Sequence, residues 1–291
     1  MRKKLHLVAP ACLAALSLFT PAPPNSARAQ EGAKPAAAQA PKSEVPQSDA
    51  SKSRAAKADE KALAVVARAV EALGGAAYLG VRSVVSQGYY TQFRDGVGGI
   101  PSTFRDYLVF PDRERTEFKG AAGRSVQVNT GDTGWLFDGK KKLLTDVTPE
   151  QAADFRTVMR TSVDNVLRGW WRAEGASLAY VGRREAGLAR RNEVVRLSYA
   201  DGFEVEFEFD AREGLPSKVV YKRPNAEGET VEEEDRYAQF ILVGAVRFPY
   251  VIDHYRAGVQ TSRVNYDKVE VNTAVPDSLF AKPADVKSIK L

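Results

Sequence analysis

Residues 203–209 read Phe-Glu-Val-Glu-Phe-Glu-Phe. Apolar and acidic side chains alternate at every position, and successive side chains of a β-strand point to opposite faces of a sheet. One face of this strand is therefore expected to be buried, and the other to be charged and in contact with water. Asp201-Gly202 directly before it is a hairpin signal, which predicts a neighbouring antiparallel strand over residues 194–199.

The same period of two recurs along most of the chain. A second hairpin is predicted at Asp138-Gly139, between strands over residues 134–137 and 141–145. Further strands are predicted over residues 82–93, 103–110, 113–119, 124–130, 177–183, 216–223, 230–243, 246–256 and 259–271. Many short antiparallel strands joined by Gly- and Asp-containing turns indicate a barrel or a sandwich.

A first helix is predicted over residues 54–73. Its apolar positions recur at spacings of three and four, which places them on one face, and they are Leu63, Val66, Val70 and Leu73. Gly74-Gly75 is expected to end this helix. A short helical turn is expected to follow at residues 76–79.

A second helix is predicted to interrupt the strands. Thr148-Pro149-Glu150-Gln151 is a start signal, because Thr148 can cap the helix and Gln151 can bond back to the cap. The apolar stripe that follows at spacings of three and four consists of Phe155, Met159, Val163, Val166 and Trp170, with Leu167 and Trp171 beside it. This stripe either packs against a sheet as ordinary core or lines and covers a cavity.

The N-terminus indicates export. Residues 1–4 are positively charged, residues 5–19 are mostly apolar, and Ala27-Arg28-Ala29 fits the small-residue cleavage pattern of a secretory signal. We therefore predict a signal peptide over residues 1–29 that is cleaved after Ala29. In a bacterium with an outer membrane, the mature protein would be periplasmic.

Cys12 is the one cysteine of the chain. It lies within the apolar run, and Pro10-Ala11 before it make a poor motif for lipid attachment. On this interpretation the mature chain has no cysteine, which excludes disulfides, thiol catalysis and cysteine-based metal sites.

The composition is ordinary for a globular protein, with 291 residues, 44% hydrophobic and 27% charged. Without residues 1–29 the chain has 38 basic and 37 acidic side chains, which gives no support for nucleic-acid binding. In residues 30–53, 16 of 24 side chains are Ala, Pro, Ser or Gln and none is aromatic, so we predict a disordered linker. A globular domain is expected over residues 54–283, followed by a tail at 284–291.

Familiar catalytic and metal-binding patterns are missing. His254, the one histidine of the mature chain, is interpreted as a surface or strand residue because catalysis needs a positioned partner. The acidic run at residues 232–235 lacks a calcium-loop pattern and is interpreted as a solvated strand end. Lys140-Lys141-Lys142 could touch anionic lipid headgroups, but at a hairpin tip it is interpreted as solubilising charge. We expect a protein that is not an enzyme and needs no metal or cofactor.

Several segments together resemble a known family. They are Glu71–Gly75, Gly131–Gly139, Thr148–Glu150, Phe209–Pro216 with its Asp-Ala-Arg-Glu-Gly-Leu-Pro turn, and Tyr266–Pro283, which ends in Val-Pro-Asp-Ser-Leu-Phe-Ala-Lys-Pro. Their order over residues 60–283 resembles the outer-membrane lipoprotein-sorting superfamily, the LolA/LolB-like proteins.

The resemblance implies a mainly β fold with helices: a curved, unclosed antiparallel half-barrel that is capped by helices. It also implies a monomeric periplasmic carrier of lipid or lipoprotein acyl chains, with an inner-membrane releasing transporter or an outer-membrane acceptor as partners. Related members are envelope-stress sensors, so a protein-interaction module on the same fold is the alternative function. A lid-latching arginine is implied as well, and Arg82, Arg105 and Arg113 lie near the early strands.

On this fold the apolar strand and stripe indicate the candidate ligand-binding residues. The concave wall would be formed by Phe203, Val205, Phe207 and Phe209, and its cover by Phe155, Met159, Trp170 and Trp171. Each buried acyl methylene would contribute about 0.8 kcal/mol to binding. Ordinary core packing is the alternative role of the same side chains.

Overall fold

The computed structural model describes residues 57–225 and 227–289. The predicted signal peptide and linker, and the first residues of the predicted 54–73 helix, lie outside the described residues. The helices are α1 (Glu60–Leu73), α2 (Ala76–Leu79), α3 (Pro149–Thr161) and α4 (Val163–Arg168), with the 3-10 turns η1 (Trp170–Arg172), η2 (Asp277–Leu279) and η3 (Val286–Ser288). The strands are β1 (Ser83–Arg94), β2 (Val97–Gly98), β3 (Ser102–Val109), β4 (Arg113–Gly120), β5 (Gly123–Thr130), β6 (Thr133–Asp138), β7 (Leu143–Asp146), β8 (Ser177–Glu185), β9 (Arg191–Ser198), β10 (Glu204–Asp210), β11 (Pro216–Pro224), β12 (Thr230–Val243), β13 (Val246–Arg256) and β14 (Val259–Val271).

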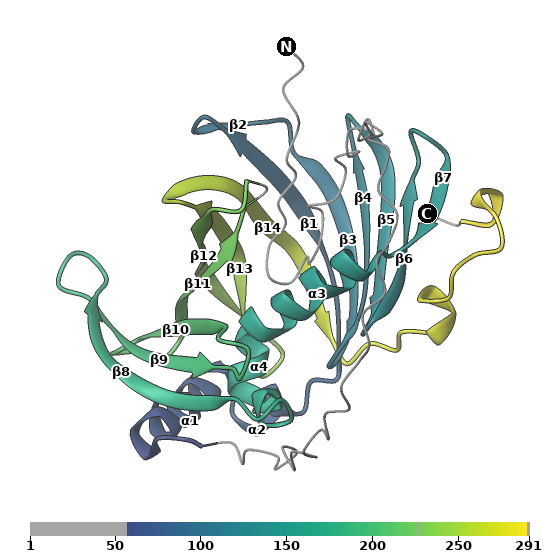
Figure 1. Cartoon of the computed structure of the whole chain (residues 1–291). Coiled ribbons are helices and arrows are strands. Elements are labelled where there is room, and N and C mark those ends of the chain that lie inside the picture. Colours follow the sequence, from purple (N-terminus) through teal and green to yellow (C-terminus); the bar gives the residue numbers. More distant parts are fainter. Residues whose placement is uncertain (1–56, 226, 290–291) are drawn as a thin grey trace, which may run out of the picture.

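The described strands form one antiparallel sheet in the order β7-β6-β5-β4-β3-β1-β14-β13-β12-β11-β10-β9-β8, with β2 paired to β1 (Figure 1). β1 and β14, the first and last long strands, pair at the centre and join two meanders. The sheet is strongly curved, but β7 and β8 remain at its two edges (Figure 1). The predicted unclosed, helix-capped half-barrel is therefore confirmed.

Both faces of this sheet are covered in part by other segments, and we call them the inner face and the outer face. The inner face carries α1, α3 and α4, whereas the outer face carries the C-terminal segment that follows β14 (Figure 1). Within residues 57–289, no helix is long and apolar enough to cross a membrane.

The 203–209 alternation forms β10, which pairs with β9 and β11 as a hairpin signal and a period of two predict. Its inner-face side chains are each 1% exposed, and they are Val205, Phe207 and Phe209. The expected wet outer face is wrong at Glu208, whose side chain is also only 1% exposed.

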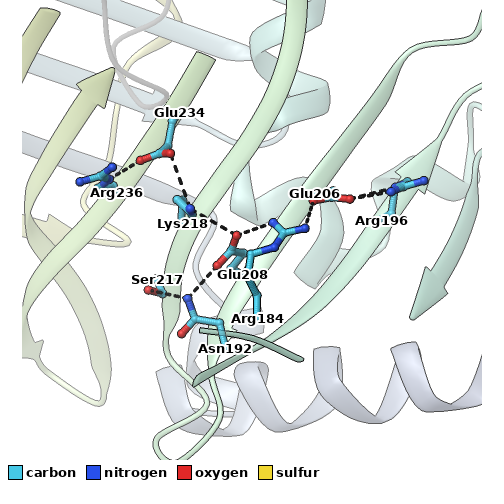
Figure 2. Close-up of polar contacts among 9 residues, drawn as sticks. All are labelled: Arg184, Asn192, Arg196, Glu206, Glu208, Ser217, Lys218, Glu234 and Arg236. Atoms are coloured by element: carbon cyan, nitrogen blue, oxygen red, sulfur yellow. Dashed lines mark hydrogen bonds and ion pairs between the residues drawn. The ribbon is translucent and has the colours of Figure 1, made fainter. Parts of the chain in front are cut away.

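Glu208 is buried by a network of charged and polar side chains across the outer face of β8–β12 (Figure 2). Arg184 Nη1 lies 2.7 Å from Glu208 Oε1, and Asn192 Nδ2 donates to Oε2 at 2.8 Å. Lys218 Nζ adds a 3.4 Å ion pair from the other side. Each carboxylate oxygen of Glu208 thus has a donor, which offsets part of the cost of its burial.

The first predicted helix is confirmed as α1, with a later start. Asp59 caps it by accepting a hydrogen bond from the Lys61 N–H at 2.8 Å, so the helix begins at Glu60 rather than at residue 54. Gly74 ends it with φ 128°, and a Cβ there would lie 2.3 Å from the Ala245 carbonyl oxygen. Only glycine fits this positive-φ position against the β12–β13 turn.

The second predicted helix is two helices. Thr148 and Gln151 form the predicted capping box, and α3 then ends at Ser162, whose extended backbone (φ −60°, ψ 135°) starts α4. The Ser162 hydroxyl accepts from the Asp164 N–H, so one residue ends the first helix and caps the second. The continuous stripe predicted from Phe155 to Trp170 is therefore wrong, because its two ends lie on different elements.

Candidate functional site

Four of the eight predicted ligand-binding residues lie in a closed core. Val205, Phe207 and Phe209 pack with Trp171 against the apolar side of α1 and α4, and each of the four is 1% exposed. The same cluster contains the buried stripe of α1 with Val66, Val70 and Leu73. The two helices cover the inner face of β8–β11 at these four side chains.

The other four predicted residues line two clefts, although Phe155 is itself only 2% exposed. Phe155, Met159 and Trp170 line a cleft of about 220 Å³ beside the β5–β6 turn. Phe203 lines a different cleft of about 730 Å³, whose other walls are mainly charged and include Arg160 and Glu206. The structure thus distributes the eight predicted residues over a core and two clefts, and their binding role stays a prediction.

A third cavity, which the sequence reasoning missed, lies at the far end of the sheet. It has a volume of about 290 Å³ and sits where hairpins join β1 to β3, β4 to β5 and β6 to β7. We call it the hairpin pocket. Its apolar lining includes Tyr90, Ile100, Phe118 and Leu136, and its basic lining consists of Arg124, Lys140 and Lys141.

The strand register places the β6–β7 turn beside this pocket. The Gly139 N–H donates to the Arg124 carbonyl at 2.8 Å, and a Cβ on Gly139 would lie only 2.5 Å from that oxygen. The β6–β7 turn is thereby held directly against the start of β5. Lys140 and Lys141 then lie at the hairpin end of the sheet, whereas the alternation of β5 puts the Arg124 side chain on the outer face with Val126.

Among the described residues, Asp138 is the one carboxylate that lines the hairpin pocket. Its Oδ1 accepts from the backbone N–H groups of Lys140 and Lys141 at 3.0 Å each, and its Oδ2 lies 3.4 Å from the Lys141 ammonium. Partial burial opposes ionisation, but these hydrogen bonds and the ammonium lower the pKa of Asp138 below its ordinary value. The carboxylate is therefore engaged by its own turn.

Deeper on the inner face, the strands of this half carry polar side chains. Ser86, Asp106, Thr116 and Gln127 are directly opposite one another on β1, β3, β4 and β5, and all are buried. Burial raises the pKa of Asp106 to about 8, against the hydrogen bond donated by the Thr116 hydroxyl at 2.8 Å. At neutral pH this carboxyl is mostly protonated and neutral.

A second polar row crosses β12, β13 and β14. Asp235, His254 and Ser262 are directly opposite one another and are at most 4% exposed. His254 Nδ1 contacts the Asp235 carboxylate, and among the described residues His254 Nε2 has no hydrogen-bond partner. His254 is a strand residue as predicted, but the acidic run is not a solvated strand end, because Glu233 and Asp235 are buried.

Helix α3 is attached to the rest of the protein by ion pairs at three points. Asp154 lies 3.8 Å from Arg223 of β11, and Arg156 lies 2.5 Å from Asp132 of the β5–β6 turn. Arg160 pairs with Asp201 at 2.6 Å and with Glu174 at 2.7 Å. The apolar contacts of α3 are few and centre on Phe155 with Val158 and Met159.

The arginines considered from the resemblance have other partners. Arg113 pairs with Asp277 at 2.6 Å on the outer face, and Arg105 stacks on the Tyr107 ring. Arg82 contributes a backbone N–H to Asn272. In the described residues, the arginine that joins the sheet to α3 is instead Arg223, which the sequence reasoning did not select.

Comparison with known proteins supports the fold. No family model matches the sequence, and no curated protein matches it significantly. A LolA superfamily protein from Nitrosomonas europaea is 13% identical, with a TM-score of 0.53 over 76% of this chain and 97% of that one. A putative outer membrane lipoprotein-sorting protein domain from Vibrio parahaemolyticus is 10% identical, with a TM-score of 0.52 over 77% and 97%.

A DUF1329 family protein from Desulfovibrio piger is similar to the same degree, with 10% identity and a TM-score of 0.53 over 77% of this chain and 98% of that one. Identities this low show the fold alone. The chain therefore has the LolA-like architecture, an open antiparallel half-barrel with helices on its inner face.

Proposed function

We propose that this protein is an exported carrier that binds the acyl chain of a lipid or lipoprotein inside its half-barrel. The observation that carries the proposal is the hairpin pocket, an inner-face cavity with apolar walls at an open end of the sheet. Its volume of about 290 Å³ lies just below the range of about 300–1,000 Å³ that is typical of ligand pockets. The signal sequence would place the carrier in the periplasm, where acyl chains need protection from water.

Binding would rest on removal of apolar surface from water. Each methylene that enters the pocket would contribute about 0.8 kcal/mol, against walls formed by Tyr90, Phe118 and Leu136. Ile100 is 83% exposed and lines the pocket from the β1–β3 connection, so it would cover an entering chain. The α3 cleft with Phe155, Met159 and Trp170 is a further surface along which the chain could extend.

The first test is mass spectrometry of an organic extract from the secreted protein, purified from its native host. We expect an acylated molecule to co-purify in stoichiometric amount. A clean extract from folded protein, with no binding of added lipid, would contradict the carrier proposal. It would favour the alternative of a protein-interaction module, which cross-linking in the native host would then test.

Variants sharpen this test. Ile100→Glu and Leu136→Glu place a charge in the pocket, so the yield of bound lipid should fall at least several-fold, because a charge next to an acyl chain is costly to desolvate. The matched control is Val181→Glu, an exposed β8 residue that does not line the hairpin pocket. Thermal melts of all three should resemble that of the wild-type protein. Equal lipid in the pocket variants and the control would locate the ligand elsewhere.

A further inference from the structure

A buried amide side chain lies at the inner end of the hairpin pocket. Gln127 of β5 lines the pocket and is only 5% exposed. Its side-chain amide makes no hydrogen bond with any other described residue. A buried polar group without a partner is costly, and a ligand that bonds to it removes this cost. Gln127 is therefore a group of the pocket wall that a ligand can satisfy.

The strand register places Gln127 at the end of an apolar passage. It lies four residues after Gly123, the first residue of β5, which puts it about 13 Å from the hairpin end. Phe118 and Ser125 are directly opposite one another nearer that end, and both line the pocket. Leu136, which also lines it, is directly opposite Gln127 on β6. A chain that enters from the open end passes Phe118 before it reaches the amide.

The side chains next to Gln127 offer hydrogen bonds without a counterion. Thr116 is directly opposite Gln127 on β4, and its hydroxyl donates to Asp106 at 2.8 Å. Both residues are buried, and burial raises the pKa of Asp106 to about 8, so this carboxyl is mostly neutral at pH 7. A charged ligand group would lose its hydration here and gain no opposite charge.

From this arrangement we infer that the pocket selects an acyl chain with an uncharged oxygen, a hydroxyl or a carbonyl, in its buried part, and that Gln127 hydrogen-bonds this oxygen. The inference rests on the proposed function and specifies its ligand. The amide NH₂ can donate to either group, and the amide oxygen can accept from a hydroxyl. A plain hydrocarbon chain would instead leave the amide unpaired.

The test uses the full mature chain and displacement of the neutral fluorescent probe N-phenyl-1-naphthylamine. The competitors are lysophosphatidylcholines that differ only near the chain end and stay below micelle formation: lauroyl, 12-hydroxylauroyl, 11-oxolauroyl and 11-carboxyundecanoyl. An extended chain of this length is similar to the depth of Gln127. We expect the hydroxyl and oxo chains to bind at least as tightly as the plain chain, and the carboxylate chain at least tenfold more weakly.

The decisive variant is Gln127→Met, which keeps the length of the side chain and removes its hydrogen-bonding groups. Relative to the plain chain, the hydroxyl and oxo chains should lose about tenfold in affinity, because their oxygen is then buried without a partner. Gln127→Leu is measured in parallel, and thermal melts check that both variants fold. The matched control is Gln87→Met, an exposed β1 residue that does not line the pocket, and it should keep the wild-type preference.

The outcomes separate the two proposals. If the oxygenated chains bind much more weakly than the plain chain, if the carboxylate chain binds as tightly as they do, or if the folded Gln127 variants keep the wild-type preference, the Gln127 assignment is wrong while the carrier function stands. If no ligand displaces the probe from folded protein, both proposals are wrong. If the preference is lost only in the Gln127 variants, the tighter of the hydroxyl and oxo chains identifies the oxygen.

Discussion

The two halves of the sheet bury opposite faces. In β8–β11 the inner face is the apolar one, filled by α1 and α4, and the outer face carries the Glu208 network (Figures 1 and 2). In β5 and β6 the outer face carries an apolar core that the C-terminal segment covers, with Val126, Val128, Trp135 and Phe280. The inner face of that half is instead polar at its centre and open at its hairpin end.

This difference shows where a ligand can bind on a curved open sheet. A strongly apolar face must be covered, and in the β8–β11 half the protein covers it with its own helices. A face with mixed side chains can remain partly open, because its polar groups tolerate water. The strongest alternation in the sequence therefore marks a filled core, and the weaker pattern of β1–β6 surrounds the pocket.

The largest expected effect is at Phe207. Phe207→Ala should lower the free energy of unfolding by about 3–5 kcal/mol, because it leaves a cavity in the β8–β11 core. Urea denaturation would measure the loss. Ile100→Ala, at an exposed position, should change stability by less than about 0.5 kcal/mol. A loss below about 1 kcal/mol at Phe207 would contradict the filled-core description and return this strand to the candidate binding wall.

The buried Asp235–His254 pair lies on β12 and β13, between the two halves of the sheet, and it should stabilise the fold. Asp235→Ala leaves a buried imidazole without its carboxylate and should cost about 3–5 kcal/mol of unfolding free energy. Asp235→Leu combined with His254→Phe removes both polar groups and should recover most of that loss. If the double variant is as unstable as Asp235→Ala, Asp235 and His254 stabilise the fold through contacts other than the one with each other.

Local patterns predicted local structure well. The α1 stripe, the Gly74-Gly75 stop, the Thr148 capping box and nearly all strand bounds could be read from neighbours within a few residues. The end of α3 at Ser162 was missed because Val163 continues the apolar spacing and no proline or glycine marks the break. A serine that can cap the next helix was the available signal.

The candidate site could not be predicted from local patterns in the sequence. The hairpin pocket takes side chains from segments as far apart as Tyr90 and Lys141, which only the sheet order brings together. Burial of Glu208 likewise depends on Arg184 and Lys218 from other strands. A contact between two strands that are distant in sequence does not change the periodic pattern of either strand.

The buried carboxyl group of Asp106 should make the unfolding free energy of the protein depend on pH. Its pKa is about 8 in the folded protein and near 3.8 when unfolded, so the unfolded state releases this proton first. The contribution of Asp106 to stability is therefore full below about pH 4 and is lost as the pH rises toward 8. Asp106→Asn should match the wild-type protein at pH 4 and exceed its unfolding free energy by several kcal/mol at pH 9.

Denaturant titrations at both pH values would measure this effect. Asp95→Asn, at an exposed turn, is the control and should show no such crossover. An equal difference between Asp106→Asn and wild-type protein at pH 4 and pH 9 would mean that Asp106 is ionised in the folded state throughout. The inner face of β1–β5 would then have to be wetter than its burial indicates.

The smallest effect concerns α3, which joins the two halves through exposed ion pairs. Asp132→Asn, Asp154→Asn, Glu174→Gln and Asp201→Asn together remove the α3 ion pairs that involve Arg156, Arg223 and Arg160. Each exposed pair is worth about 1 kcal/mol or less, so global stability should change little. Amide hydrogen exchange should accelerate several-fold in Pro149–Thr161 and remain unchanged in Glu60–Leu73, because α1 is fixed by the apolar core and α3 is not. Asp277→Asn, which removes the Arg113 pair on the outer face, should leave both helices unchanged. Faster exchange in α1 as well would show that α3 belongs to the filled half and does not open independently over the polar one.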